Sequence, residues 1–226
     1  MAGMSLATTA FAKAAIGSTE IQKISIGDTL VWSASPALFH AISTPSEGQS
    51  TLSPSVTLSA AGTVLVPVSM RGDNTVTAIT LNGDAMTHIV SIAHGNSGGN
   101  GYLRVYAKTG VPAGTASVSI TRSGGAFGRA YAVAYTGVNT IGTPDTAFGT
   151  GTSVSHNPAA PPANGLVFWV LSLFQSTAIT PSGGDVRGNY TGSNGSFAVL
   201  DASTDSTFSA TLGASTPWSS AAIPLS

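Results

Sequence analysis

Regular strand alternation broken by tight turns, over residues 75–138, is the feature that most constrains how this chain folds. Ile79 and Leu81 are two residues apart, so they lie on the same face of an extended strand. Asn82-Gly83 follows them and supplies two residues that tolerate positive φ, as a two-residue hairpin turn requires. Three apolar residues are expected on one face of the returning strand: Met86, Val90 and Ile92. The segment therefore predicts an antiparallel hairpin.

Two further segments show the pattern of buried strands. In residues 129–135, the large side chains of Tyr131, Val133 and Tyr135 alternate with three alanines. This alternation predicts a central strand that is covered on both faces. Residues 166–174 form a nearly unbroken apolar run, which predicts a second strand buried on both faces.

The remaining segments are less regular. Residues 139–164 contain several prolines and glycines, so we expect a long loop there with one short strand at 153–155. In the β-rich run 64–68, Pro67 indicates either an edge strand or a bulge. The last three strands are expected at residues 197–200, 207–212 and 218–225.

These signals together predict an all-β fold. About ten short strands separated by Gly, Pro and Asn turns, with no convincing helix, indicate two packed antiparallel sheets. We therefore predict an antiparallel β-sandwich of jelly-roll type over residues 37–226. A chain of 226 residues is long enough to bury a sizeable core without a metal or a disulfide.

Residues 1–36 differ from the body and are predicted to form a separate attachment arm. Residues 6–16 are rich in alanine, and their spacing fits either a short helix or a flexible arm. Residues 21–32 predict a small hairpin that turns at Gly27-Asp28. A lone hairpin is marginally stable in water, so this one is expected to need a partner surface. The candidate interface residues are Ile21, Ile24, Ile26, Asp28, Val31 and Trp32.

The charge balance excludes several kinds of partner. The chain carries 8 Lys and Arg against 9 Asp and Glu, and its charged fraction is only 8%. Nucleic-acid binding requires a basic stripe, which these few cations do not supply. No apolar run reaches the length of about 20 residues that a membrane-spanning helix needs, so no membrane insertion is expected. A weakly charged surface repels its neighbours little, which favours a subunit held in contact with others.

Several short motifs suggest chemistry, and each has a simpler interpretation. Residues 95–99, GNSGG, match the nucleophile-elbow pattern with Ser97 as nucleophile, but no helix is expected after them. His88 and His94 share strand parity, yet no third metal ligand stands beside them. Asp201 and Asp205 lack the spacing of a calcium loop and are expected in a solvated turn. With 0 cysteines there is no thiol chemistry.

Asp73 and Asp84 are not placed opposite each other by any pattern, so a glycosidase pair is unsupported. We therefore predict no catalytic residue, no metal and no cofactor. One surface remains a candidate contact face, because tyrosine and arginine favour protein and sugar contacts: Tyr102, Arg104 and Tyr106. The alternative is that these tyrosines pack inside, between sheets.

Several segments of the sequence together resemble a known protein family. Residues 21–32, IQKISIGDTLVW, followed by a sandwich rich in Gly, Ser and Thr, resemble minor tail proteins of tailed bacteriophages that infect mycobacteria and related actinobacteria. Four body segments are similar as well: ITLNGDAMT at 79–87, VPAGTASV at 111–118, AVAYTGV at 132–138 and WSSAAIPL at 218–225.

The resemblance implies a non-enzymatic virion subunit that is assembled in the host cytoplasm and attached through its arm to other virion proteins. Such subunits form closed symmetric sets, and a homotrimer is expected. Two alternatives stay open: a capsid decoration protein, or a module that binds a host-surface glycan or receptor. A hydrolase acting through Ser97 is a third reading, from a different class.

Overall fold

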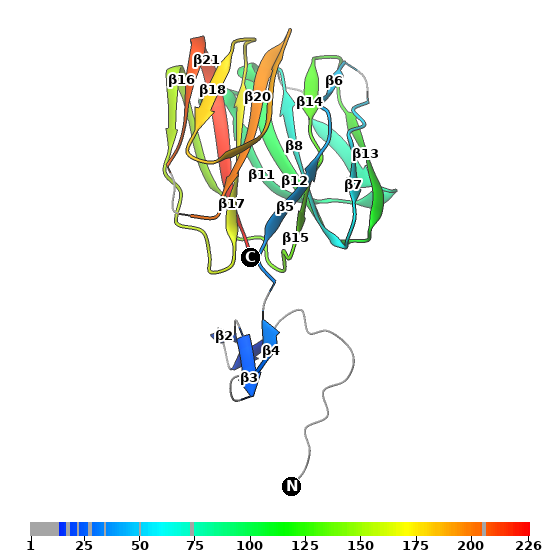
Figure 1. Ribbon diagram of the computed structural model, residues 1–226. Coiled ribbons are helices and arrows are strands. Elements are labelled where there is room, and N and C mark those ends of the chain that lie inside the picture. The colour runs from blue at the N-terminus through cyan, green and yellow to red at the C-terminus, as the bar shows by residue number, and fades with distance from the viewer. Residues whose placement is uncertain are drawn as a thin grey trace.

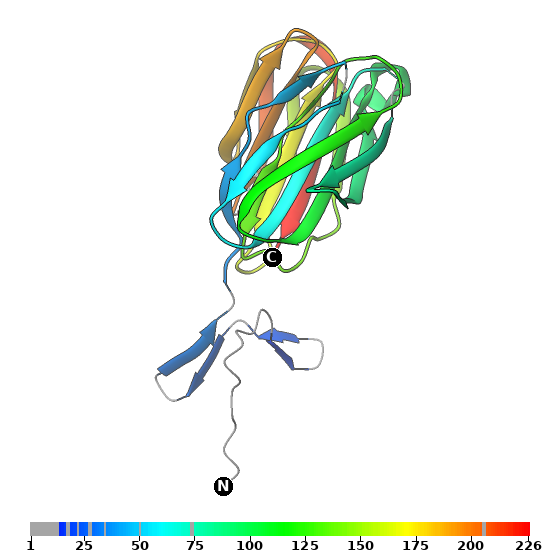
Figure 2. The same ribbon diagram turned by 90° about the vertical axis from the view of Figure 1, so that its right-hand side faces the viewer.

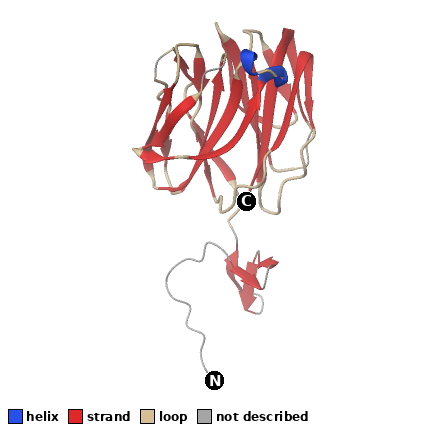
Figure 3. Ribbon diagram, turned by 180° about the vertical axis from the view of Figure 1, so that it is seen from behind, coloured by secondary structure: helices blue, strands red, loops and turns tan. Residues whose placement is uncertain are grey.

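The computed structural model describes residues 14–16, 19–21, 23–26, 29–33, 35–49, 51–72, 75–204 and 207–226. Nearly all of its regular elements are β-strands, and the strand pairs are antiparallel. The helical elements among the described residues are two short 3-10 turns, η1 (His94–Asn96) and η2 (Gly98–Asn100), visible in blue in Figure 3. The prediction of an all-β antiparallel fold is confirmed.

The body contains three sheets. The first has the strand order β10 (Asp84–Ala85), β9 (Val76–Leu81), β13 (Gly114–Arg122) and β7 (Ser55–Leu58). The second has the order β11 (Thr87–Ala93), β12 (Tyr102–Val111), β8 (Gly62–Met70), β14 (Gly128–Ala130) and β6 (Ser46–Gly48), with β15 (Val133–Thr136) joining β8 to β5 (Leu38–Ile42). The third has the order β16 (Asp145–His156), β21 (Phe208–Leu225), β17 (Leu166–Leu173), β20 (Gly195–Ala202) and β19 (Asp185–Gly192), with β18 (Ile179–Ser182) against β21.

The seven-stranded sheet lies between the other two (Figure 1). In β8, Val64 and Val66 belong to the core shared with the four-stranded sheet, whereas Leu65 belongs to the core shared with the six-stranded sheet. Two packed sheets were expected from the sequence, and the structure has three. The reason is that the central strands present apolar side chains on both faces, so each face needs a cover.

The side chains of residues 130–135 alternate between two cores, as the sequence predicted. Tyr131, Val133 and Tyr135 enter one core, and the alanines between and before them enter the other. The segment is nevertheless two strands, β14 and β15, because Pro67 of β8 lies between the residues that pair with each. Proline has no N–H to donate, so Pro67 offers the neighbouring strand only its carbonyl oxygen, which accepts the N–H of Tyr131 at 3.3 Å. On the side away from β8, Ala132 hydrogen-bonds with Ser43. Pro67 thus sits in a central strand, opposite an interruption.

The Asn82-Gly83 turn forms as predicted, with φ of 51° and 92°. The returning strand is much shorter than predicted, because β10 contains only Asp84 and Ala85. The chain then crosses to the central sheet and continues as β11. Met86 therefore packs in the first core and Ile92 in the second, and the expectation that they share one face is wrong.

β17 matches the predicted buried strand, and each of its eight residues is buried. Its two faces enter different cores, since Phe168 and Val170 face the central sheet while Trp169 and Leu171 face the opposite way. The ring of Trp169 stacks on Phe208 of β21 at a centroid distance of 5.3 Å. The six-stranded sheet therefore also has a covered outer face.

This outer cover comes from β16 and β21 folding back over their own sheet. Residues 145–151 of β16 pair with residues 216–222 of β21, and residues 153–156 pair with residues 208–211. Twelve extended residues would span about 36 Å, yet the side chains of Asp145 and His156 come within 3.6 Å. The expectation of a long loop over 139–164 is therefore wrong for residues 145–152, which belong to this bent strand, whereas the short strand expected at 153–155 lies within it.

The N-terminal arm contains two hairpins, β1 (Ala14–Ile16) with β2 (Thr19–Ile21) and β3 (Lys23–Ile26) with β4 (Thr29–Ser33). The predicted hairpin within residues 21–32 corresponds to β3 and β4. The helix considered for residues 6–16 lies mostly outside the described residues, and residues 14–16 are a strand. Each hairpin forms its own two-stranded sheet, outside the sheets of the body (Figure 2).

Gly101 shows how closely the backbones of β12 and β8 approach. It has a φ of 95°, and a Cβ built on it would lie 1.9 Å from the carbonyl oxygen of Met70. We predict that Gly101→Ala lowers the free energy of unfolding by about 3 kcal/mol or more, because backbone strain and a steric clash add together. The matched control is Gly110→Ala, at a φ of 66° with open space around it, where about 1 kcal/mol is expected. Urea unfolding of both variants measures the difference, and equal losses would contradict the steric argument.

Candidate functional site

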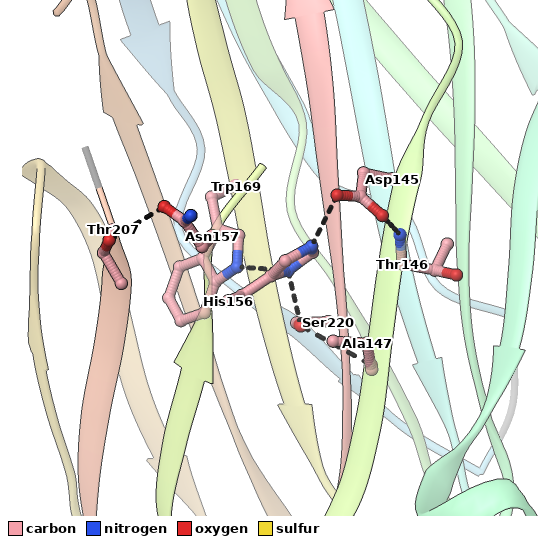
Figure 4. Close-up of polar contacts among 8 residues, drawn as sticks. All are labelled: Asp145, Thr146, Ala147, His156, Asn157, Trp169, Thr207 and Ser220. Atoms are coloured by element: carbon pink, nitrogen blue, oxygen red, sulfur yellow. Dashed lines mark hydrogen bonds and ion pairs between the residues drawn. The ribbon is translucent and has the colours of Figure 1, made fainter. Parts of the chain in front are cut away.

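The polar cluster at the fold-back of β16 has the connectivity of a Ser-His-Asp triad (Figure 4). Ser220 Oγ lies 2.9 Å from His156 Nδ1, and Asp145 Oδ2 lies 3.6 Å from His156 Nε2. The indole N–H of Trp169 donates to the same Nδ1 at 3.1 Å. Because Nδ1 accepts this hydrogen bond, the proton of the neutral imidazole sits on Nε2, which faces the carboxylate.

Access distinguishes this cluster from the active site of a serine hydrolase. Ser220 is completely buried and His156 is 5% exposed, so no substrate carbonyl can reach the hydroxyl in this structure. Trp169 also competes with the hydroxyl for the one basic nitrogen. The cluster joins the two ends of the bent strand β16, through Asp145 and His156, and His156 also contacts β17 and β21. Burial lowers the pKa of His156, and the charge of Asp145 partly opposes that shift.

A second polar cluster is enclosed between the central and six-stranded sheets. The imidazole of His94 is fully buried, with Nδ1 2.7 Å from Ser219 Oγ and Nε2 3.4 Å from Ser172 Oγ. Ser172 in turn donates to Ser69 Oγ at 2.6 Å. The hydroxyls satisfy a histidine that would otherwise be costly to bury.

Arg129 lies near this cluster and is 1% exposed. Its Nε and Nη2 atoms have no hydrogen-bond partner among the described residues. Burial, together with the positive charge of Arg129, lowers the pKa of His94 to about 3. His94 is therefore neutral over the ordinary pH range, and the cluster is a structural feature of the core rather than a proton-transfer site.

The low pKa of His94 predicts a loss of stability in acid. The unfolded chain, with a histidine pKa near 6.5, binds a proton between pH 6.5 and pH 3 that the folded state does not bind. The stabilisation is therefore complete above pH 6.5 and declines as the pH falls through that window. Between pH 6.5 and 4.5 we expect a loss of about 2 to 3 kcal/mol from this group.

Urea unfolding at a series of pH values measures this loss, with His94→Gln as the variant in which the contribution disappears. NMR titration of the folded wild-type protein provides a second readout, because the His94 imidazole signals should not shift between pH 7.5 and 4.5. A His94 titration midpoint near 6.5 would contradict the prediction.

A third polar cluster surrounds Asp201, which was expected in a solvated turn. That expectation is wrong, because Asp201 is 3% exposed. Its carboxylate accepts two hydrogen bonds from Arg187, at 2.8 and 2.9 Å, and one from the Tyr135 hydroxyl at 3.0 Å. Burial and the Asp201 charge together raise the pKa of Tyr135 far above its usual value. Asp205 lies outside the described residues.

Arg187 also contacts Asp185 at 2.9 Å, which allows a matched comparison of two carboxylates on one guanidinium. We predict that Asp201→Ala costs about 3 kcal/mol, because it leaves the buried Tyr135 hydroxyl without an acceptor and removes the main partner of Arg187. Asp185→Ala should change stability by about 0.5 kcal/mol or less, since its side chain is 75% exposed. Thermal and urea unfolding measure both variants. Similar losses would show that the burial of Asp201 is not what matters.

The remaining sequence candidates do not converge. His88 is exposed and packs against the ring of Tyr106, whereas His94 is buried, so the two histidines do not form a metal site. Ser97 is exposed between η1 and η2, without the strand-to-helix turn of a nucleophile elbow. Asp84 pairs with Lys108 at 3.4 Å, and Asp73 lies outside the described residues. No group of three or more metal-ligating side chains gathers within the described part of the chain.

The proposed contact face of Tyr102, Arg104 and Tyr106 divides between surface and core. Tyr106 is only 8% exposed and packs in the first core, so it does not belong to a surface. Arg104 lies over the ring of Tyr102 at 4.9 Å, and its Nε donates to Ser91 Oγ at 3.2 Å. Tyr102 and Arg104 are half-buried and leave a small contact area.

Of the predicted arm interface, Ile24 on β3 is 38% exposed. The side chains of Ile21, Ile26, Val31 and Trp32 lie outside what the structure describes, as does Asp28. Beside the junction of arm and body, a shallow recess of about 660 Å³ is lined by residues 36–38, 160–165 and 203–204. Its lining is mostly Pro and Ala and contains no titratable side chain.

No family model, curated protein sequence or solved structure matches this chain. None of the described helices is long and apolar enough to span a membrane.

Proposed function

We propose that this protein is a non-enzymatic structural subunit of a bacteriophage particle, a minor tail protein that is built into the tail through its N-terminal arm. The observation that carries the proposal is the arm. Among the residues of the arm that the structure describes, the two hairpins pair only within themselves, and Ile24 presents an apolar side chain that is 38% exposed. Two-stranded hairpins of three to five residues a strand are marginally stable alone, so they gain most from contact with a neighbouring subunit.

The body supports this proposal through what its polar groups do. The clusters around His94, His156 and Asp201 are buried and hold strands together. The chain as a whole has a net charge of −1 and few charged residues. Such a surface provides little electrostatic repulsion between copies, which favours dense packing in an assembly.

The resemblance to minor tail proteins covers both parts of the molecule. Its most distinctive segment, residues 21–32, corresponds to the β3–β4 hairpin. In the proposed arrangement the arm contacts other virion proteins and the body is displayed outward. A closed symmetric set of copies, a trimer, is the proposed unit of attachment.

Replacing the arm's exposed apolar residue should therefore prevent incorporation. We predict that Ile24→Asp reduces the amount of this protein in purified particles of the phage that encodes it by at least about tenfold, because a buried unpaired charge at an interface costs several kcal/mol. Deleting residues 1–35 should abolish incorporation while leaving a folded body. Quantitative immunoblotting of gradient-purified particles measures both effects.

The matched control is Ser119→Asp, which places the same charge at an exposed position on β13 of the body. It should incorporate like the wild type. Immunogold labelling of particles then gives the location: label at the tail supports the proposal, and label over the head supports capsid decoration instead. Normal incorporation of the arm deletion would show that attachment does not use the arm.

A further inference from the structure

Among the described strands, β16 over residues 146–151 is a long sheet edge with little of the usual protection against pairing with another strand; at its start, the Thr146 N–H donates to Asp145 Oδ1 at 2.8 Å. β16 is the terminal strand of the six-stranded sheet and pairs only with β21. Edge strands are normally short, charged, irregular or interrupted by proline, since a free row of N–H and C=O groups recruits other strands.

Most other edges of the body carry one of these features. β10 has two residues and β6 has three, including Glu47. β18 contains Pro181. β11 has a register shift at His88, and β19 has one beside Arg187. β16 differs from them over residues 145–151, which pair with β21 without any irregularity.

The free edge carries a charge only at its first residue, Asp145, and exposes a large apolar side chain. After Asp145, residues 146–151 read TAFGTG, with no charge and no proline. Phe148 is 49% exposed, and its neighbours two positions away, Thr146 and Thr150, are exposed on the same side of the strand. Ala147, on the other side, packs against the outer core of the sheet. The side with Ala147 is therefore fixed inside the body, whereas on the other side Thr146, Phe148 and Thr150 remain exposed beside η1.

We propose that a second copy of this chain pairs with this edge, β16 against β16 in antiparallel orientation, across a two-fold axis at Phe148. The pairing extends the six-stranded sheet into a continuous sheet through two bodies. In this register Phe148 faces its own counterpart, Thr146 faces Thr150, and Asp145 faces Gly151.

Self-complementarity is the reason to assign a second copy rather than another partner. An isologous contact requires that the same segment satisfy itself, and the edge segment does so because its centre is an aromatic residue flanked by threonines at equal distances. The single charge is at one end, so antiparallel pairing separates the two Asp145 carboxylates, whereas parallel pairing would bring them together. Residues 146–151 carry no charge that would call for a partner of opposite charge.

The contact is independent of the arm. It joins two bodies through their sides, whereas the arm extends from residue 37 at the start of the body. A single strand pair buries little surface, so we expect a weak dimer in free solution. Because a two-fold contact joins copies in pairs, in an assembly of trimers it would join bodies of neighbouring trimers that are held close together.

Cysteine cross-linking tests the pairing, because the chain has 0 cysteines and each introduced thiol is unique. In Phe148→Cys, two thiols meet across the axis at a separation compatible with a disulfide. Under copper–phenanthroline oxidation we expect a covalent dimer at a rate at least about tenfold above the control. The control is Val186→Cys, since Val186 is also 49% exposed and lies on β19 at the opposite edge of the same sheet.

The register is tested with two further variants of the full-length chain. Thr146→Cys and Thr150→Cys should cross-link with each other when mixed and much less with themselves. Circular dichroism and the thermal midpoint confirm that each variant is folded before oxidation. Equal dimer yields from Phe148→Cys and Val186→Cys would overturn the proposed interface. Self-cross-linking of Thr146→Cys in preference to the mixed pair would overturn the register and the position of the two-fold axis at Phe148.

Discussion

Burial of the central sheet on both faces is the constraint on which the rest of this structure depends. β8 contributes Val64 and Val66 to one core and Leu65 to the other, so neither outer sheet can be removed without exposing apolar side chains. The outer face of the six-stranded sheet is apolar as well. There Trp169 of β17 is covered by Phe208 of β21, because β21 folds back over its own sheet. The layered form of the body follows from this repeated need to cover apolar faces.

The sequence pattern predicted the strands that contribute large apolar side chains to a core between sheets. The tyrosines and alanines of residues 130–135 and the apolar run of β17 are of this kind. The first half of β16 escaped prediction because its inward positions are small: Ala147 packs in the outer core, and Gly149 lies under the ring of Trp218, where a Cβ would be 2.8 Å from that ring. A strand whose partner supplies the bulk shows no apolar period of its own.

The polar clusters were beyond sequence reasoning for a different reason. Asp201 is bonded to Tyr135, which is 66 residues away, and His94 to Ser219, which is 125 residues away. Nothing in the local sequence marks these serines and aspartates as buried. The hairpin within residues 21–32 could be predicted because its sequence signal is local: a turn lies between two short alternating runs. Long-range polar pairs require the fold before they can be recognised.

β21 lies between β16 and β17 in the six-stranded sheet, and this position determines when that sheet can form. Its two halves pair with β16, β17 and β18, so the last layers cannot close until residues 208–225 have left the ribosome. Until then β16 and β17 have no central neighbour between them. Folding of this body is therefore dominated by contacts between distant parts of the chain, which makes slow folding the expected behaviour.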